Sequence, residues 1–144
     1  MHKLELGILI GLHRSVNMID KKTKKLVSDQ GLTFSQFMVL EALYSKGDMS
    51  VGEVRDRILS SEGTIPLIVN NLVKMGCIER RVCEEDKRVS ILHLTQTGYD
   101  LIHEIAPKNE ALIVDSMKAL DKEEKKELAY LLKKLGGRLD GKTS

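Results

Sequence analysis

Opposed charges gather in one short stretch of the chain, "EEDKR" at residues 84–88. The guanidinium of an arginine forms short, charge-assisted hydrogen bonds to carboxylates and to phosphates. Arg88 could make such bonds to an anionic partner, and Asp86, two residues earlier, could hold the long side chain in position. A polar hairpin turn would have a similar composition. The residues alone leave both interpretations open, so the surrounding elements must decide between them.

A β-hairpin is predicted on either side of this charged stretch. From Cys77 to Leu94 the hydrophobic period changes to two, with Ile78, Arg80 and Val82 alternating against Glu79, Arg81 and Cys83. The segment "RVSILHL" is β-branched and apolar, as expected of the returning strand. The charges would therefore occupy the tip of a two-stranded hairpin.

Four helices are predicted before the hairpin. Apolar residues recur at helical spacing over 4–27, and Gln36 follows Thr33 at capping-box spacing in a helix that ends at Gly47. Ser50 and Glu53 repeat that spacing at the start of a short third helix. The fourth runs to Gly76, with Ser60 or Ser61 as a possible cap. Because Pro66 fits only the first turn of a helix, this helix either begins later than Ser61 or has a distorted start.

Two further helices are predicted after the hairpin. Thr95 caps the first of them, in which Pro107 predicts a kink or a break. Asp121 and Glu124 form another capping box at the start of the last helix. Helices followed by a two-stranded hairpin are typical of a winged helix-turn-helix, in which the second helix of the pair enters the major groove of DNA.

The composition argues against several other classes of protein. The chain has 144 residues and a formal net charge of +2, which fits one folding unit but does not by itself indicate a nucleic-acid partner. Two cysteines six residues apart fit neither a redox pair nor a disulfide scaffold, so we expect packing roles for them in a reducing cytoplasm. The four histidines lack metal-ligand spacing, and no catalytic motif is found, so we expect no metal, no cofactor and no enzyme activity. No apolar run is long enough to span a membrane.

The fourth predicted helix can be divided into two faces. If Ile65, Ile68, Val69 and Leu72 are buried, the opposite face presents Leu67, Asn70 and Lys74, with Pro66 and Asn71 at its sides. Asparagine can bond adenine, leucine can contact thymine methyl groups, and lysine suits phosphate. This face carries little charge, so non-specific affinity would depend on arginines and lysines of the preceding helix and of the hairpin.

The chain resembles the MarR (multiple antibiotic resistance regulator) family of winged helix-turn-helix transcriptional regulators. The family's pattern D-x-R followed by L-T-x-x-G is matched by Asp86, Arg88, Leu94, Thr95 and Gly98, and "LTFSQFMVLEAL", "NNLVKMGCIER" and "EIAPKNEALI" resemble its corresponding segments. The resemblance implies a mostly α (α+β) fold in a single domain, 1–144. It also implies a winged helix-turn-helix lobe at 32–94 and dimerisation helices at 1–28 and 95–138.

The resemblance also implies a function. Arg88 would reach into the DNA minor groove, whose negative potential favours a guanidinium, and Asp86 would position it. We expect a homodimeric repressor that reads a pseudo-palindromic operator and is released by a small-molecule effector. The alternative is a winged helix that binds protein or RNA, because this fold does not require DNA as its partner.

Two sets of site residues follow from these arguments. The predicted DNA-binding residues are Arg55, Arg57, Ser61, Thr64, Leu67, Asn70, Asn71, Lys74, Arg80, Arg81, Asp86, Lys87 and Arg88. The predicted effector pocket, which rests on the resemblance and a rough topology, is lined by His13, Val16, Asn17, Phe34, Phe37 and Met38.

Overall fold

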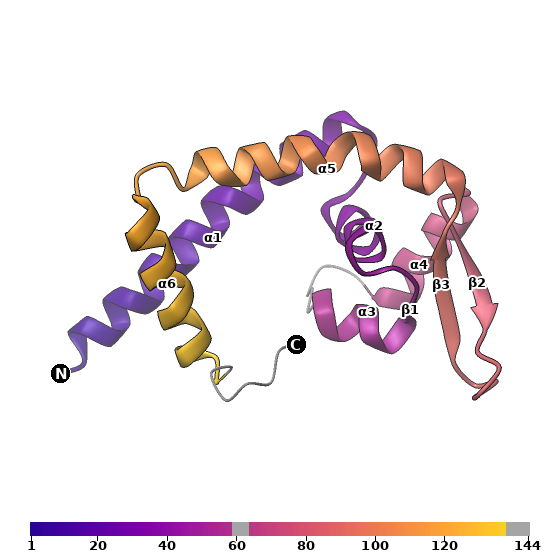
Figure 1. Ribbon diagram of the computed structural model, residues 1–144, viewed down its shortest axis with the longest axis horizontal. Coiled ribbons are helices and arrows are strands. Elements are labelled where there is room, and N and C mark those ends of the chain that lie inside the picture. The colour runs from indigo at the N-terminus through magenta and orange to yellow at the C-terminus, as the bar shows by residue number, and fades with distance from the viewer. Residues whose placement is uncertain (59–63, 138–144) are drawn as a thin grey trace.

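A computed structural model describes residues 1–58 and 64–137 of the chain. Its elements, in chain order, are α1 (Lys3–Asp29), α2 (Phe34–Lys46), β1 (Met49–Ser50), α3 (Val51–Ile58), α4 (Ile65–Lys74), β2 (Ile78–Val82), β3 (Ser90–Leu94), α5 (Gln96–Ser116) and α6 (Lys122–Leu135). Figure 1 shows two long helices, α1 and α5, with α2 to α4 and the sheet gathered at one end. The N-terminal half of α1 and α6 lie at the other end. The mostly α fold with a small sheet is therefore confirmed.

The predicted helix starts are present as hydrogen-bonded caps. Thr33 with Gln36, and Asp121 with Glu124, form complete capping boxes, in which each side chain accepts from the other residue's backbone N–H. Thr95 Oγ1 accepts from the N–H of Gly98. Each such cap satisfies backbone donors that the first turn of a helix leaves without a partner.

The helix with Pro66 begins late. Its first residue is Ile65 and its N-cap residue is Thr64, so Pro66 lies in the first turn, where it does not interrupt the helix. The first of the two alternatives for this helix is therefore correct. The candidate caps Ser60 and Ser61 lie outside the described residues.

Helix α5 is not broken at its proline. It runs from Gln96 to Ser116 with Pro107 inside, so of the two predicted alternatives the break is wrong, and the kink stays a prediction. A proline in a helix costs about 3 kcal/mol or more, but packing on both sides of it opposes that cost. Ile105 is fully buried before the proline, and after it Asn109 Oδ1 accepts a hydrogen bond of 2.7 Å from the buried Thr23 of α1.

The sheet has three antiparallel strands in the order β1-β3-β2, one more than the predicted hairpin. The extra strand is short: Met49 and Ser50 pair with Leu92 and Ile91 of β3. In the hairpin itself, the ladder from Ile78 opposite Leu94 to Val82 opposite Ser90 fixes which β2 side chains share a face. Ile78 and Arg80 therefore lie on the same side of β2, and Arg81 on the other.

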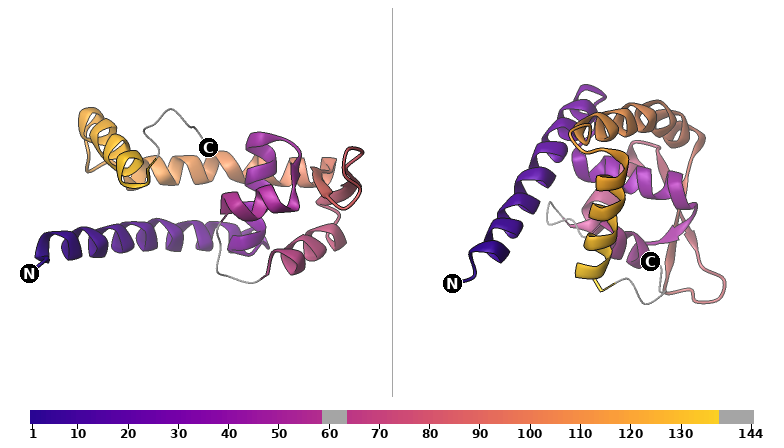
Figure 2. Two further views of the ribbon diagram at one scale, coloured as in Figure 1. Left: turned by 90° about the horizontal axis from the view of Figure 1, so that it is seen from below. Right: turned by 60° about the vertical axis from the view of Figure 1, so that its left-hand side comes forward.

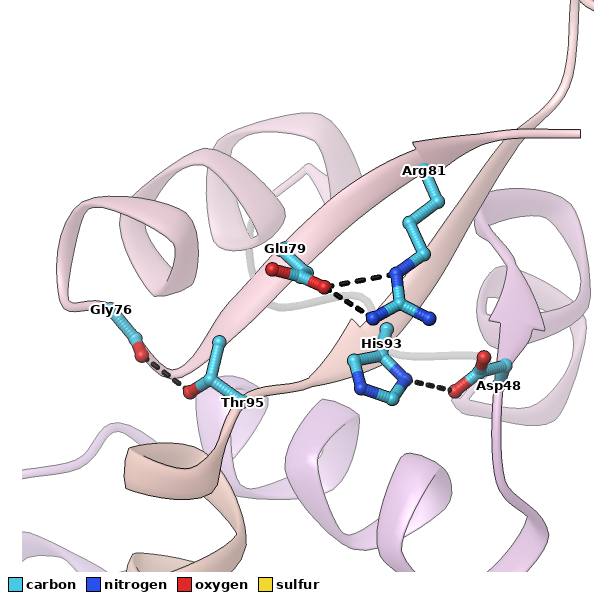
Figure 3. Close-up of polar contacts among 6 residues, drawn as sticks. All are labelled: Asp48, Gly76, Glu79, Arg81, His93 and Thr95. Carbon is cyan, nitrogen blue, oxygen red and sulfur yellow. Dashed lines mark hydrogen bonds and ion pairs between the residues drawn. The ribbon is translucent and has the colours of Figure 1, made fainter.

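One glycine determines how the hairpin joins α5. A Cβ atom on Gly98 would lie 2.0 Å from the carbonyl oxygen of Cys77, so no larger residue fits without movement of the backbone. The same junction is held by Thr95, whose N–H donates to Cys77 O and whose Oγ1 donates to Gly76 O (Figure 3). The Leu-Thr-x-x-Gly pattern therefore has a structural reason: threonine caps the helix, and glycine allows its first turn to contact the preceding turn.

The hydrophobic core lies in the lobe and in the parts of α1 and α5 that cover it. Every element of the lobe contributes a buried residue, and α5 contributes Ile102 and Ile105. The largest fully buried side chains include Phe37, Leu40, Val54, Val69, Leu72, Ile78, Leu92, Ile102 and Ile105. Helix α6 buries no side chain, and in α1 only Thr23 and Val27 are buried. The views in Figure 2 agree that the N-terminal half of α1 projects away from the lobe. In the described ranges, no helix is both long and apolar enough to cross a membrane.

Candidate nucleic-acid interface

Helix α4 has the two faces that its sequence predicts. Ile65, Ile68, Val69 and Leu72 are buried against the lobe, whereas Leu67, Asn70 and Lys74 are exposed. Leu67 is 56% exposed, although it is apolar. Among the side chains that the helix presents to solvent are thus an apolar, an amide and a cationic group, three chemistries that suit a thymine methyl group, a base edge and a phosphate.

The hairpin tip holds Arg88 by a two-point contact with Asp86. Arg88 Nε donates to Asp86 Oδ1 at 3.1 Å, and Arg88 Nη2 donates to Oδ2 at 3.2 Å. The backbone N–H of Arg88 also donates to Asp86 Oδ1, at 3.0 Å. These hydrogen bonds from Arg88 lower the pKa of the Asp86 carboxyl below its usual value. The Arg88 side chain nevertheless stays 90% exposed, so its remaining donors can reach a partner.

The two arginines of β2 have different surroundings. Arg80 lies on the side of α4, and its Nη2 donates to the Oδ1 of Asn70. Arg81 points away from that face, and its Nε and Nη2 both donate to Glu79 Oε1, at 2.9 and 2.6 Å (Figure 3). His93, across the ladder from Glu79, bonds Asp48 through Nδ1 at 2.7 Å. The alternation of the strand was visible in the sequence, but the partners of these side chains were not.

A hollow between α3, α4 and the hairpin brings three of the predicted DNA-binding residues together. Arg55, Arg80 and Arg88 all line it, together with Pro66 and other apolar or small residues of α3, α4 and the hairpin. No acidic side chain is among its lining residues in the described part of the chain. Three guanidinium groups line this hollow, and one of them is paired with Asp86, so the surface keeps a local positive charge that the net charge of +2 conceals.

The other predicted DNA-binding residues are more scattered. Lys74 and Lys87 are exposed, Thr64 is the exposed N-cap of α4, and Asn71 is half-buried. Arg57 lines a different hollow, between α2 and α3, with Glu53 and Asp56. Ser61 lies outside the described residues.

The six predicted effector-site residues do not line one cavity of the single chain. His13, Val16 and Asn17 are exposed on the projecting part of α1, whereas Phe37 is buried in the core. Phe34 is half-buried, and the ammonium of Lys24 lies 5.4 Å from the centre of its ring. Met38 lines the hollow between α2 and α3. Within the described ranges these residues thus belong to four separate environments.

The cysteines differ in their surroundings. Cys77 is buried in the core, and burial raises the pKa of its thiol above its usual value. Its predicted packing role is therefore confirmed. Cys83 is only half-buried, and its Sγ lies 3.5 Å from Glu85 Oε2, so its packing role stays a prediction.

Comparisons with known proteins agree with this architecture. A sequence model of the MarR family matches residues 30–89. The HTH-type transcriptional regulator MhqR of Bacillus subtilis is 31% identical over 94% of this chain and 94% of its own length. The transcriptional repressor MprA of Escherichia coli is 30% identical over 90% of this chain and 74% of its own length.

Solved structures give the same result. The Streptomyces coelicolor MarR-family regulator AbsC superposes with a TM-score of 0.83 over 99% of this chain and 98% of its own, and its 19% identity supports the fold alone. Wild-type MarR of E. coli is 27% identical, with a TM-score of 0.70 over 90% of this chain and 95% of its own. The chain has a winged-helix lobe with a charged hairpin tip, and MhqR is similar to it over almost the whole length of both chains. The chain therefore belongs to the MarR family of transcriptional regulators.

Proposed function

We propose that the chain is a homodimeric, cytoplasmic repressor that binds a pseudo-palindromic DNA operator. The observation that carries this proposal is the hairpin arginine Arg88, fixed by Asp86 yet 90% exposed, beside the exposed face of α4. A fixed, exposed guanidinium next to a solvent-facing helix suits simultaneous contact with a minor groove and the adjacent major groove. Because the Arg88 side chain and this face of α4 are both exposed, they do not contribute to packing of the core.

The dimer follows from apolar surface that the single chain leaves exposed. The exposed apolar side chains include Leu4, Ile8 and Leu9 of α1 and Leu131 and Leu135 of α6, which are 49% to 74% exposed. Monomeric proteins rarely expose apolar patches of this kind. In this proposal 1–144 forms a single domain, 32–94 is the DNA-binding lobe, and 1–28 with 95–138 are the dimerisation helices. A two-fold axis through those helices would present two copies of α4 to successive turns of DNA.

Most of the affinity would come from phosphate contacts. The predicted set of arginines and lysines on α3, α4 and the hairpin would neutralise phosphates, whereas Leu67 and Asn70 would contact bases. With six to ten such contacts in the dimer, affinity should fall about 10³- to 10⁵-fold between 50 and 200 mM salt. The charge clustered around Arg55, Arg80 and Arg88 supports this assignment.

A small-molecule effector is also part of the proposal. The structure of Bordetella bronchiseptica BpsR, 25% identical and with a TM-score of 0.77, is described as a mechanism for regulation of DNA binding by 6-hydroxynicotinic acid. An effector that changes the distance between the two copies of α4 would alter DNA affinity, with a coupling of about 1–3 kcal/mol. Because His13, Val16 and Asn17 are exposed on α1, a second chain would be needed to enclose them beside Phe34 and Met38.

Selection from a pool of random duplex DNA, at physiological salt, tests the proposal. A folded repressor should recover a pseudo-palindrome whose half-sites are about 10 base pairs apart. Arg88→Ala should then weaken binding to that sequence by about 1–3 kcal/mol without changing the circular dichroism or the mass of the dimer. Lys108→Ala, which removes one exposed charge from α5, is the control and should bind with the affinity of the original protein. An Arg88→Ala protein of unchanged affinity would contradict the role of the hairpin.

A protein- or RNA-binding winged helix remains the second candidate. The observation that favours it is the pair of exposed acids Glu84 and Glu85 at the hairpin tip, which would repel phosphates. If the selection recovers no motif from folded dimer, this candidate replaces the first.

A further inference from the structure

One hydrogen bond joins the exposed face of α4 to the hairpin. Arg80 Nη2, on β2, donates to Oδ1 of Asn70, in the middle of α4. The orientation of the amide is fixed by this contact, because a guanidinium has donors and no acceptor. Both residues have the exposure that a base contact requires.

Both side chains lie next to buried residues of the core. Arg80 lies opposite the fully buried Leu92 in the β2–β3 ladder, and Asn70 follows the buried Ile68 and Val69 on α4. Around Arg80 the hollow is lined by Arg55 and Arg88 and, within the described part of the chain, by no acid. The positive charge of Arg80 is therefore not neutralised by a carboxylate there, in contrast to Arg81, which bonds Glu79.

This contact changes what Asn70 can recognise. A free asparagine reads adenine with two hydrogen bonds, because its oxygen accepts from N6–H while its nitrogen donates to N7. In this protein the oxygen already accepts from a cation, and the adjacent positive charge repels the amino hydrogens of adenine and of cytosine. What Asn70 and Arg80 present together is a row of N–H donors.

We propose that Asn70 and Arg80 act as one unit that reads guanine, with Arg80 as the residue that sets this specificity. Guanine offers two acceptors, O6 and N7, in the major groove, and it matches a row of donors better than any other base. One guanine would be read in each half-site of the operator. The inference rests on the proposed DNA-binding function and adds to it which base this part of α4 selects.

The test repeats the DNA selection with three variants. Asn70→Ala should weaken the preference at one base pair per half-site, which identifies the pair that Asn70 and Arg80 face. At that position the original protein should prefer guanine, and Arg80→Leu should shift the preference to adenine. The ratio of guanine to adenine binding should change by about 5- to 150-fold, the range typical of one lost two-point contact.

Arg81→Leu is the matched control. It removes the same charge from the neighbouring position of the same strand, but from the side chain that bonds Glu79. Overall affinity can fall in this variant, whereas guanine should still be preferred at the Asn70 position. A loss of phosphate attraction alone would affect Arg80→Leu and Arg81→Leu equally, and that result would contradict the inference.

The remaining outcomes separate the two proposals. A motif with adenine at the Asn70 position, or a guanine preference that survives Arg80→Leu, would overturn this inference and leave the repressor intact. An Asn70→Ala protein with an unchanged motif would do the same. Failure of the folded original protein to select any motif would overturn the proposed function itself, and this inference with it.

Discussion

The lobe and the projecting helices bury their apolar residues to very different extents. In the lobe, every helix and strand contributes at least one buried or half-buried apolar side chain to a common core. In α6 no side chain is buried, although its leucines recur at helical spacing just as those of α2 do. The same sequence signal thus corresponds to a filled core in one region and to an uncovered stripe in the other. The difference supports the proposed dimer, in which a second chain would cover the projecting helices and not the lobe.

The largest expected effect is in the lobe. Leu40 is fully buried, so Leu40→Ala should lower the free energy of unfolding by about 2–5 kcal/mol through lost burial and the cavity left behind. Denaturant unfolding at several protein concentrations measures it, and the loss should not depend on concentration. A loss below about 1 kcal/mol would mean that the lobe is packed no more tightly than the projecting helices.

The matched change in the projecting helices is Leu131→Ala. Leu131 is 49% exposed in the single chain, so its effect should come through the dimer, at about 1.5–3 kcal/mol per buried side chain. Sedimentation should show a weaker dimer, and the loss of stability should grow as the protein is diluted. Unchanged sedimentation would remove Leu131 from the dimer contact and contradict the contrast between the regions.

The junction between the regions is tested at Gly98. A methyl group there would meet Cys77 O at 2.0 Å, so Gly98→Ala should destabilise the protein by about 1–3 kcal/mol or more, because the backbone must move. Thermal unfolding measures this change. Gly52→Ala is the control: its nearest neighbour would be Ser50 Oγ at 3.9 Å, so the better helix propensity of alanine should leave stability equal or slightly higher. Equal effects at the two glycines would contradict the close approach.

The smallest effect concerns the hairpin tip. Because the pKa of Asp86 is lowered in the folded protein, its ion pair with Arg88 is fully formed above the usual carboxyl range and is lost as the pH falls through the lowered value. Protonation of the Asp86 carboxyl should therefore not affect DNA binding near neutral pH. Titration of the Asp86 carboxyl by NMR should give a pKa below its ordinary value of 3.8, and Arg88→Ala should restore that value. An Asp86 pKa that is the same in both proteins would show that the pair does not form in solution.

Local features of the fold were predictable because each depends on a few neighbouring residues. Short sequence patterns predict the capping boxes at Thr33 and Asp121 and the two faces of α4, and the structure confirms these features. The two-residue strand β1 was not predictable, because it exists only by pairing with β3, more than forty positions away in the chain. The break is absent at Pro107 for a similar reason: Ile105 is buried in the core before the proline, and Thr23 of α1, far away in the chain, bonds Asn109 after it.

The candidate site divides in the same way. The sequence by itself determined the winged-helix order, the exposed Leu67, Asn70 and Lys74, and the Asp86–Arg88 pair, since those residues lie within one helix or one turn. Only the tertiary structure decided that Arg80 bonds Asn70 while Arg81 bonds Glu79, and that Arg55, Arg80 and Arg88 line one hollow. The physical reason is that periodicity tells which side of a strand a residue faces, whereas the packing of α3 and α4 against the sheet decides what it meets there.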